Sequence, residues 1–461
     1  MATIGNDADK IAGLATLAEK DNVKFIRLQF VDIHGTLKNL AIPVKHLGDA
    51  LTKGTGFDGS SIEGFTPIYD SDMIAKPDPN TWAILPWRPQ ELKTGRLICD
   101  IWRPSGKPFE GDPRYILKRA IQNVTEMGYK YLTGPELEFF LVRHDGGSKV
   151  FPMDNGGYFD VIPLDLGTDV RRDAILAMED FGLEIELSHH EVAPGQHEID
   201  FRFGEALEVA DKAITYKAVM KAIALQHKTI ATFIPKPLYG ENGSGMHVHQ
   251  SLFSLETGEN AFYSKNATNF LSDIGRWYIG GLLKHAKALT AIVAPTINSY
   301  KRLVPGYEAP VYLTWGFGNR SCLIRVPLYH PKIENAMRAE FRSPDGSCNP
   351  YLALACMLTA GLDGIKNQID PGENIQENVY KFSEKDLEDR GIDTLPCSLE
   401  EALNELERDS IIKDALGEYT LKKFIKLKKK ECAAYADFVK DDPDHAIKIT
   451  QWELDRYLIR V

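Results

Sequence analysis

Residues Glu241-Asn242-Gly243-Ser244-Gly245-Met246-His247-Val248-His249 carry two histidines at positions i and i+2, directly after a glycine-containing turn. Residues two apart on a β-strand point to the same face. The same spacing of polar side chains occurs in Gly134-Pro135-Glu136-Leu137-Glu138 and in Arg338-Ala339-Glu340-Phe341-Arg342. A further polar segment, His189-His190-Glu191, runs on to Gln196-His197-Glu198. Acids, histidines and arginines that short strands present to one concave surface indicate metal ions holding a polyphosphate.

The gross composition is that of a globular protein. Of the 461 residues, 43% are hydrophobic and 26% are charged, and the formal net charge is −11, which disfavours general nucleic-acid binding. Residues 1–20 lack the apolar segment of a signal peptide, and no apolar run approaches the roughly 18 residues of a membrane span. The six cysteines lack the CxxC spacing of zinc and redox sites. We therefore expect a cytoplasmic protein with reduced thiols that binds neither nucleic acid nor membrane.

Local patterns predict an α+β protein with two domains. An amphipathic helix over 7–20 is followed by alternating, half-buried strands within 23–42. The connector Arg103-Pro104-Ser105-Gly106-Lys107-Pro108 is rich in proline and glycine. We place the domain boundary there, with a small domain over 1–107 and a larger one over 108–461.

The larger domain alternates strands with helices and then becomes mostly helical from about residue 350. Asp112-Pro113 predicts a helix start, with Asp as the N-cap and Pro at the first helical position. Further helices are predicted over 169–182, 205–229 and 268–290. The lysine-rich stretch between Glu418 and Lys440 is predicted as a solvated helix face. The apolar residues of the last helix suit either core within the chain or contact with another subunit.

Carboxylates dominate the candidate metal ligands. Glu136 and Glu138 share a strand face among apolar residues, where two buried charges are unfavourable unless a cation lies between them. Alone, this pair would also suit a salt-bridged arrangement, and Glu340 would suit an ion-pair ladder with its neighbouring arginines. Together the segments offer two sets of oxygen-rich ligands without cysteine: Glu136, Glu138, Glu191, Glu198, Glu340 and His247. Such sets favour Mg²⁺ or Mn²⁺ over structural zinc.

The common phosphate-binding loops are absent from the sequence. No GxxxxGK[ST] sequence occurs, and no GxGxxG opens a helix. A nucleotide would therefore be held by metal ions and arginines. Five arginines near the Glu340 segment, several of them among apolar residues that favour a pocket, are the candidates: Arg302, Arg320, Arg325, Arg338 and Arg342.

Six segments resemble type I glutamine synthetases, closest to the alpha-type group that is not adenylylated. In chain order they are Phe57-Asp58-Gly59-Ser60-Ser61, Gly134 to Phe140, His189 to Gln196, Asn242 to His249, Asn298 to Pro310 and Asn349-Pro350-Tyr351-Leu352. This resemblance spans nearly the whole chain. It implies an N-terminal β-grasp domain and a C-terminal catalytic domain of the glutamine-synthetase/guanido-kinase type, with a curved antiparallel sheet and helices. It also implies a homo-oligomer, a dodecamer of two hexameric rings with active sites between subunits.

The resemblance implies roles for individual positions. One metal site would comprise Glu138, Glu191 and Glu198, and the second Glu136, His247 and Glu340. ATP would lie against Glu186, Phe203, His249, Ser251, Arg320, Arg325 and Arg338. Glutamate would be held by Asn242, Gly243, Arg302, Glu308, Arg320 and Arg342. The catalytic residues would be Arg320 at the transferring phosphate, Glu308 on a mobile flap, and Asp58 from a neighbouring subunit.

The implied reaction is ATP-dependent ligation of ammonium to the γ-carboxylate of L-glutamate through γ-glutamyl phosphate, with two or more Mg²⁺ or Mn²⁺ ions per active site. The nearest alternative is a γ-glutamyl-amine ligase of the same superfamily, which takes a polyamine or another amine. We favour ammonium because Asp58 keeps its full Asp-Gly-Ser-Ser context. A non-catalytic homologue would be expected to lack metal ligands, and an unrelated two-metal hydrolase would lack the glutamate-binding signature.

The sequence departs from the family pattern at positions that regulate activity. Tyr380 aligns with the adenylylated tyrosine of beta-type enzymes, but its context, Asn378-Val379-Tyr380-Lys381-Phe382, differs, so we predict no adenylylation. Gly64-Phe65 is followed by Thr66-Pro67, where many alpha-type relatives have an arginine for glutamine feedback, so we predict weak feedback. Regulation by 2-oxoglutarate or by a PII-type protein is the alternative hypothesis, and the sequence names no site for it.

Overall fold

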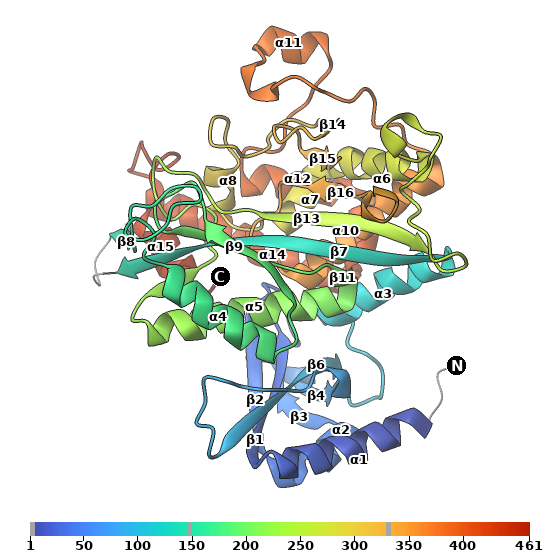
Figure 1. The fold of residues 1–461 in the computed structure, drawn as a ribbon, viewed down its shortest axis with the longest axis vertical. Helices are drawn as coiled ribbons and strands as arrows, with labels where there is room; N and C mark the ends of the chain where they lie inside the picture. Colours follow the sequence, from blue (N-terminus) through green and yellow to red (C-terminus); the bar gives the residue numbers. More distant parts are fainter. Residues whose placement is uncertain (1–4, 145–148, 329–332) are drawn as a thin grey trace.

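Two β-sheets with associated helices organise the chain (Figure 1). The computed structural model describes residues 5–144, 149–328 and 333–461. The smaller, six-stranded sheet has the order β2-β1-β6-β4-β3, with β5 on β6, and lies in the lower part of Figure 1. The larger, ten-stranded sheet has the path β14-β15-β16-β13-β7-β10-β9, with β8, β11 and β12 paired to β7. The predicted α+β class is confirmed.

The smaller sheet is built around β1, whose alternating residues Ile26 and Leu28 are fully buried. β1 pairs antiparallel with β2 and parallel with β6, and its buried face packs against Leu14 and Ala18 of α1 in one apolar core. The elements of this N-terminal module are α1 Gly5–Lys20, β1 Val23–Val31, β2 Leu37–Pro43, α2 Leu47–Lys53, β3 Thr55–Asp58, β4 Asp72–Pro77, β5 Ala83–Ile84 and β6 Lys93–Trp102.

The larger sheet is centred on the 16-residue strand β7, Tyr129–His144. Its two long neighbours, β13 Met246–Ser254 and β10 Gln196–Phe201, both run antiparallel to it. The remaining strands are β8 Val150–Pro152, β9 Ile185–His190, β11 Gly204–Glu205, β12 Ile230–Thr232, β14 Trp315–Phe317, β15 Ile324–Val326 and β16 Ala339–Phe341. These strands carry most of the predicted metal ligands.

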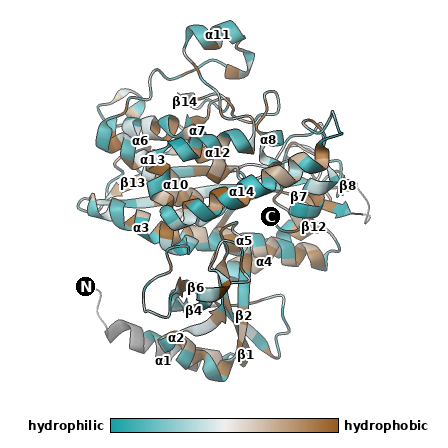
Figure 2. Ribbon diagram, turned by 180° about the vertical axis from the view of Figure 1, so that it is seen from behind, coloured by the Kyte–Doolittle hydropathy of each residue, from teal (hydrophilic) through white to brown (hydrophobic). Residues whose placement is uncertain are grey.

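Helices cover this sheet, and those of the C-terminal part lie behind β7 and β13 in Figure 1 and toward the viewer in Figure 2. α10 is almost entirely buried and contacts α3, α6 and α13. The helices are α3 Pro113–Glu126, α4 Thr168–Asp180, α5 Ala206–Gln226, α6 Asp273–Lys284, α7 Ala286–Val293, α8 Ser299–Arg302, α9 Ile333–Ala336, α10 Pro350–Asn367, α11 Glu384–Asp389, α12 Leu399–Arg408, α13 Ser410–Leu416, α14 Glu418–Val439 and α15 Gln451–Tyr457. Among the described residues, no helix is long and apolar enough to cross a membrane.

Helix starts were more predictable than helix continuity. Asp112 caps α3 through its side chain, with Pro113 at the first helical position, as predicted. The single helix predicted over 268–290 is wrong, because the chain forms α6 and α7 with a break at His285. The His285 ring is engaged by carboxylates of other helices, a long-range contact that periodicity does not report. In the last helix, Leu454 packs within the chain against Phe140 and Val142 of β7.

Candidate functional site

Strand register brings the predicted ligands into rows across the larger sheet. Glu136 of β7 lies opposite His247 of β13, and Glu138 lies opposite Glu198 of β10. On the far side of β13, His249 lies opposite Glu340 of β16. Directly opposed residues on paired strands have neighbouring side chains. Residues far apart in sequence therefore form one polar surface.

The first cluster comprises Glu136, His249 and Glu340, whose potential ligand atoms lie within 4.8 Å of one another. The His249 Nε2 is 2.7 Å from Oε1 of Glu136, and His247 Nδ1 is 3.5 Å from its Oε2. Glu340 is fully buried and accepts hydrogen bonds from Arg325 and Arg342. Burial opposes ionisation of Glu340, but His249 and Arg342 outweigh it and lower its pKa to about 2. Glu340 is therefore ionised beside Glu136, with its two oxygens engaged by Arg325 and Arg342.

The second cluster comprises His189, Glu191 and Glu198, again within 4.8 Å. Burial, reinforced by Asp200 and by Glu138, raises the pKa of Glu198 to about 12. Burial and the neighbouring Glu191 likewise raise the pKa of Glu138 to about 7. Carboxyl groups packed this closely resist ionisation, and a divalent cation among them would remove the repulsion. The donor set, mainly carboxylate oxygen, fits Mg²⁺ or Mn²⁺.

A third group, Asp154, His190 and His197, does not suit a metal. The Arg171 guanidinium lies 2.7 Å from Nδ1 of His197, so that nitrogen must accept and the ring proton of neutral His197 sits on Nε2. His190 Nε2 is engaged by Asp154 at 2.9 Å. The group is a buried hydrogen-bonded support behind Glu191 and Glu198.

A cavity of about 320 Å³ opens beside the first cluster. Its wall includes Glu136 together with five of the residues predicted to contact ATP: Glu186, Phe203, His249, Ser251 and Arg338. Phe203 is about half exposed, so its ring is available for stacking. An apolar face, several polar groups and an anionic edge suit a nucleotide held through metal-bound phosphates.

A smaller cavity of about 50 Å³ lies on the other side of the row. It gathers Glu138, Glu191 and His247 with all the residues predicted to hold glutamate except Arg320: Asn242, Gly243, Arg302, Glu308 and Arg342. Both arginines are buried, and Asn242 Nδ2 donates to Glu308 at 3.3 Å. Two buried guanidinium groups beside an amide and a backbone turn suit a small dicarboxylic acid.

Comparisons with known proteins decide the family. Residues 110–457 match the model described as "Glutamine synthetase, catalytic domain", and residues 22–104 match "Glutamine synthetase, beta-Grasp domain". The chain belongs to the glutamine synthetase family. It is 50% identical over 450 residues to the glutamine synthetase of Thermotoga maritima, covering 97% of this chain and 99% of the relative. It is also 50% identical over 447 residues to that of Methanosarcina mazei, covering 96% of each.

Solved structures share the fold of this chain. A structure titled "GmaS/ADP complex-Conformation 1" matches with a TM-score of 0.84 and 33% identity, covering 96% of this chain and 98% of that one. An apo GmaS structure without ligand matches with a TM-score of 0.82. The predicted β-grasp and catalytic domains are thus confirmed as the fold.

Not every residue predicted from the glutamine synthetase resemblance joins these cavities. Arg320 is exposed and lines neither cavity. Arg325 also lines neither cavity, but its guanidinium lies 2.7 Å from the carboxylate of Glu340, a member of the first acid cluster. Asp58, at the end of β3, is exposed in the N-terminal module, where its Oδ1 accepts from Ser60. Their predicted roles stay predictions.

Several residues at the site were missed in the sequence. Asp200 lines the larger cavity. Gln196 lines the smaller cavity, and its Nε2 donates to Glu138 at a distance of 3.0 Å. Both lie two positions from Glu198 on β10, so the alternation used for the other strands would have found them. His189 was noticed, but its approach to Glu198 depends on the pairing of β9 with β10.

Tyr380 lies within electrostatic reach of three residues of the smaller cavity, Arg342, Glu308 and Arg302. Its hydroxyl is buried and has no hydrogen-bond partner among the described residues. Adenylylation requires an accessible hydroxyl, so this burial supports the prediction that Tyr380 is not adenylylated in this glutamine synthetase family member.

Proposed function

We propose that this chain ligates ammonium to the γ-carboxylate of L-glutamate at the expense of ATP, giving L-glutamine, ADP and phosphate for nitrogen assimilation. One observation carries the proposal. Glu136 and Glu138, two positions apart on β7, line the nucleotide-sized cavity and the small arginine-containing cavity respectively. A strand that joins a nucleotide cavity to a carboxylate cavity through a row of acids suits phosphoryl transfer between the two substrates.

A carboxylate is a poor acyl donor, so the γ-carboxylate is first phosphorylated and ADP leaves. Arg302 and Arg342 hold the glutamate carboxylates, and Asn242 and Gly243 complete the binding turn. The predicted ligand sets, Glu138, Glu191 and Glu198 for one ion and Glu136, His247 and Glu340 for the other, would hold the Mg²⁺ or Mn²⁺ ions. They overlap the two acid clusters described above, in which His189 and His249 stand in place of Glu138 and His247. When bound, these ions neutralise charge on the phosphoryl oxygens. Arg338, which lines the nucleotide cavity, would add positive charge beside the same phosphates, and the family resemblance implies the same role for Arg320.

Ammonium becomes a nucleophile only after it loses a proton. Glu308 and Asp58 would attract ammonium electrostatically and take that proton. The resulting ammonia attacks the acyl carbon of γ-glutamyl phosphate. The C–N bond forms as the C–O bond to phosphate breaks, and phosphate leaves with the second proton. Asp58 lies in the N-terminal module and, in the described part of the chain, lines neither of the two site cavities, which supports donation to a neighbouring subunit in a dodecamer of two hexameric rings.

Assembly and control are proposed together. Particle mass measured with and without 2-oxoglutarate tests whether the dodecamer forms alone or on binding that acid. A mass that stays at the monomer under both conditions would overturn the shared-site proposal. The PII-type partner stays a hypothesis that a pull-down with such a protein would test.

The decisive assay is phosphate release with glutamate, Mg-ATP and ammonium for wild type, Asp58→Ala and Asp72→Ala. Asp72 is the cross-strand partner of Asp58 and is also exposed, so it is a matched control. We expect turnover that requires ammonium, a fall of roughly a hundredfold or more in Asp58→Ala, and little change in Asp72→Ala. Equal loss in both variants would remove Asp58 from the mechanism.

The second candidate, a γ-glutamyl-amine ligase, is favoured by the GmaS structures, since GmaS is a γ-glutamylmethylamide synthetase. The 50% identity to glutamine synthetases over nearly the whole chain outweighs the 33% identity to GmaS. Replacing ammonium by methylamine or putrescine in the same assay separates the two. Turnover with the amine alone would transfer the chain to the second class.

A further inference from the structure

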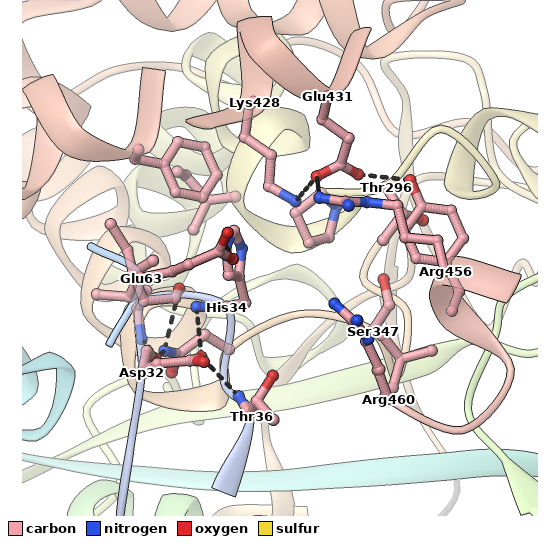
Figure 3. Close-up of a pocket in the computed structure, with 18 of the residues that line it drawn as sticks. Asp32, His34, Thr36, Glu63, Thr296, Ser347, Lys428, Glu431, Arg456 and Arg460 are labelled. Atoms are coloured by element: carbon pink, nitrogen blue, oxygen red, sulfur yellow. Dashed lines mark hydrogen bonds and ion pairs between the residues drawn. The ribbon is translucent and has the colours of Figure 1, made fainter. Parts of the chain in front are cut away.

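A separate cavity of about 330 Å³ lies where the N-terminal module meets the C-terminal helices (Figure 3). One wall is the β1–β2 turn, including His34, with Glu63 beside it. The opposite wall is α14 and the end of the chain, including Lys428, Arg456 and Arg460. It shares no lining residue with the two cavities of the catalytic site.

The positive wall carries more charge than its acids neutralise. Glu431 is buried and lies 3.2 Å from both Lys428 and Arg456, and it also accepts from the Tyr457 hydroxyl. The Glu431 carboxylate is thereby engaged by three partners within the chain. The guanidinium of Arg460 has no ion-pair or hydrogen-bond partner within the described part of the chain, and Figure 3 shows it beside Ser347 at the cavity. Arg460 is exposed at this cavity, so its guanidinium is free to donate to an anionic group.

The backbone next to Arg460 is held in place. Lys221 of α5 donates to the carbonyls of Ile459 and Arg460, at 3.1 and 3.2 Å. The preceding Leu458 is buried against the sheet. The Arg460 side chain therefore extends from a fixed point rather than from a loose tail.

The facing wall carries two carboxylates: Asp32, which is paired with a lysine, and Glu63, which lies beside His34 and within electrostatic reach of Arg456 and Arg460. Asp32 accepts from the backbone N–H groups of His34 and Thr36 and lies 3.2 Å from Lys38. Glu63 lies 3.2 Å from His34 Nε2 and is 61% exposed. A bound acid would thus be attracted by Arg460 and repelled by Glu63, which sets its orientation.

The remaining lining is largely apolar. Ile33 comes from the N-terminal module, while Ile292, Leu352 and Phe424 come from α7, α10 and α14. A purely polar ion would leave this surface uncovered. A molecule with an apolar body would cover it and bridge the two domains, and about 330 Å³ is in the range of small-molecule sites.

We infer that this junction cavity binds a small organic acid, with its carboxylate or phosphate on Arg460 and an apolar body against Phe424, Leu352 and Ile33. The site is distinct from the catalytic cavities. Ser61 and Glu63, which line it, lie three and five residues after Asp58, in the turns that follow β3. An occupant would therefore hold the Asp58 segment against the C-terminal helices, and this consequence rests on the proposed function.

Binding is tested without turnover, by ¹⁹F NMR titration of the full-length protein. The probes are 4-fluorophenylacetate and 4-fluorophenyl phosphate, which distinguish a carboxylate from a phosphate ligand, with 4-fluorophenylacetamide as the neutral control. We expect saturable binding of at least one acid, no binding of the amide, and no displacement by glutamate or ATP. Failure of both acids to bind, or their displacement by either substrate, would overturn the site.

Two substitutions of opposite sign test the charges. Arg460→Gln should weaken acid binding about tenfold, because it removes a charge-assisted hydrogen bond. Glu63→Gln should tighten it, because it removes the opposing charge. Arg408→Gln, an exposed arginine on α12, is the matched control and should leave binding unchanged. Equal affinity for wild type and Arg460→Gln would overturn the assignment.

The consequence for catalysis is read separately, as the KM for ammonium with and without a saturating probe. A change in this KM that vanishes in Arg460→Gln supports coupling to the Asp58 segment. Binding with an unchanged KM would remove the coupling and keep the site. Loss of all turnover with binding intact would count against the proposed function alone.

Discussion

At the scale of single residues, Glu198 shows how neighbouring acids disfavour ionisation until a metal ion is bound. It is buried beside Asp200 and Glu138, which together with burial raise its pKa to about 12. Without metal it is therefore protonated near neutral pH, and glutamine resembles that form.

We predict that Glu198→Gln leaves the metal-free protein at least as stable as wild type but removes most of the stabilisation by Mn²⁺. A ligand at a hundredfold excess over its Kd stabilises by about 2.7 kcal/mol. Calorimetric melting with EDTA and with Mn²⁺ measures both effects. Glu205→Gln, an exposed acid on β11, is the control. A full Mn²⁺ response in Glu198→Gln would contradict the ligand assignment.

His285 allows a pH prediction at the same scale. Its Nδ1 lies 2.6 Å from Asp409 and its Nε2 3.0 Å from Asp363. Both nitrogens can donate only in the protonated ring. Burial opposes that charge, but the hydrogen bonds to Asp409 and Asp363 outweigh it and raise the pKa of His285.

A raised pKa means that the stabilisation is complete below the ordinary value of about 6.5 and is lost as pH rises through the folded pKa. We predict that His285→Gln lowers the unfolding free energy by roughly 1–3 kcal/mol at about pH 6. The melting temperature should therefore fall more at about pH 6 than at about pH 9. Melting curves of both proteins across this range test it. A difference that grows with pH would show that the ring is neutral.

At the scale of elements, glycines set the spacing of α6 and α10. A Cβ at Gly281 would lie 2.1 Å from the Ala360 carbonyl oxygen, and one at Gly364 would lie 2.0 Å from that of Trp277. These are backbone atoms, which cannot turn aside as a side chain could. The two helices can approach this closely only without side chains at the crossing.

We predict that Gly281→Ala destabilises the protein by about 3 kcal/mol through overpacking. Gly48→Ala in α2 is the matched control, because a Cβ there meets nothing within 4 Å. Its substitution should be neutral or stabilising by up to ~1 kcal/mol. Denaturant unfolding compares the two, and equal effects would mean that α6 can shift freely.

At the scale of the whole molecule, Arg114 of α3 ties the two domains together. Its buried guanidinium donates to Asp78 and Asp100 of the N-terminal module, at 2.8 and 2.7 Å, and to both oxygens of Asp211 in α5. Asp100 is also paired with Lys118 and Asp211 also accepts from the Tyr351 hydroxyl, but among the described residues Arg114 alone contacts all three acids.

We predict that Arg114→Met costs roughly 3–5 kcal/mol, because it leaves the buried Asp211 and the partly buried Asp78 without their cation. It should also separate the unfolding of the N-terminal module from that of the rest, giving two calorimetric transitions. Arg172→Met, which breaks only exposed pairs with Asp169 and Asp173, should change neither. A single, unshifted transition in Arg114→Met would show that the apolar contacts alone join the domains.

The sequence by itself determined which faces carry the chemistry. Glu136 with Glu138, and His247 with His249, share faces because alternation along a strand is a local property of the backbone. The Asp112-Pro113 helix start is local for the same reason, since a cap involves only neighbouring residues.

Only the tertiary structure decided which of these faces meet. Contacts between distant segments bring His249 close to both Glu136 and Glu340, and they bring Asp200 to the site beside Glu198. A distant contact also engages His285, where the helix predicted over 268–290 is interrupted. The junction cavity is the clearest case, because its walls run from Asp32 to Val461. Lys428, predicted to lie on a solvated face, is buried there. Register and packing depend on the whole chain closing at once, whereas periodicity reports only on each segment alone.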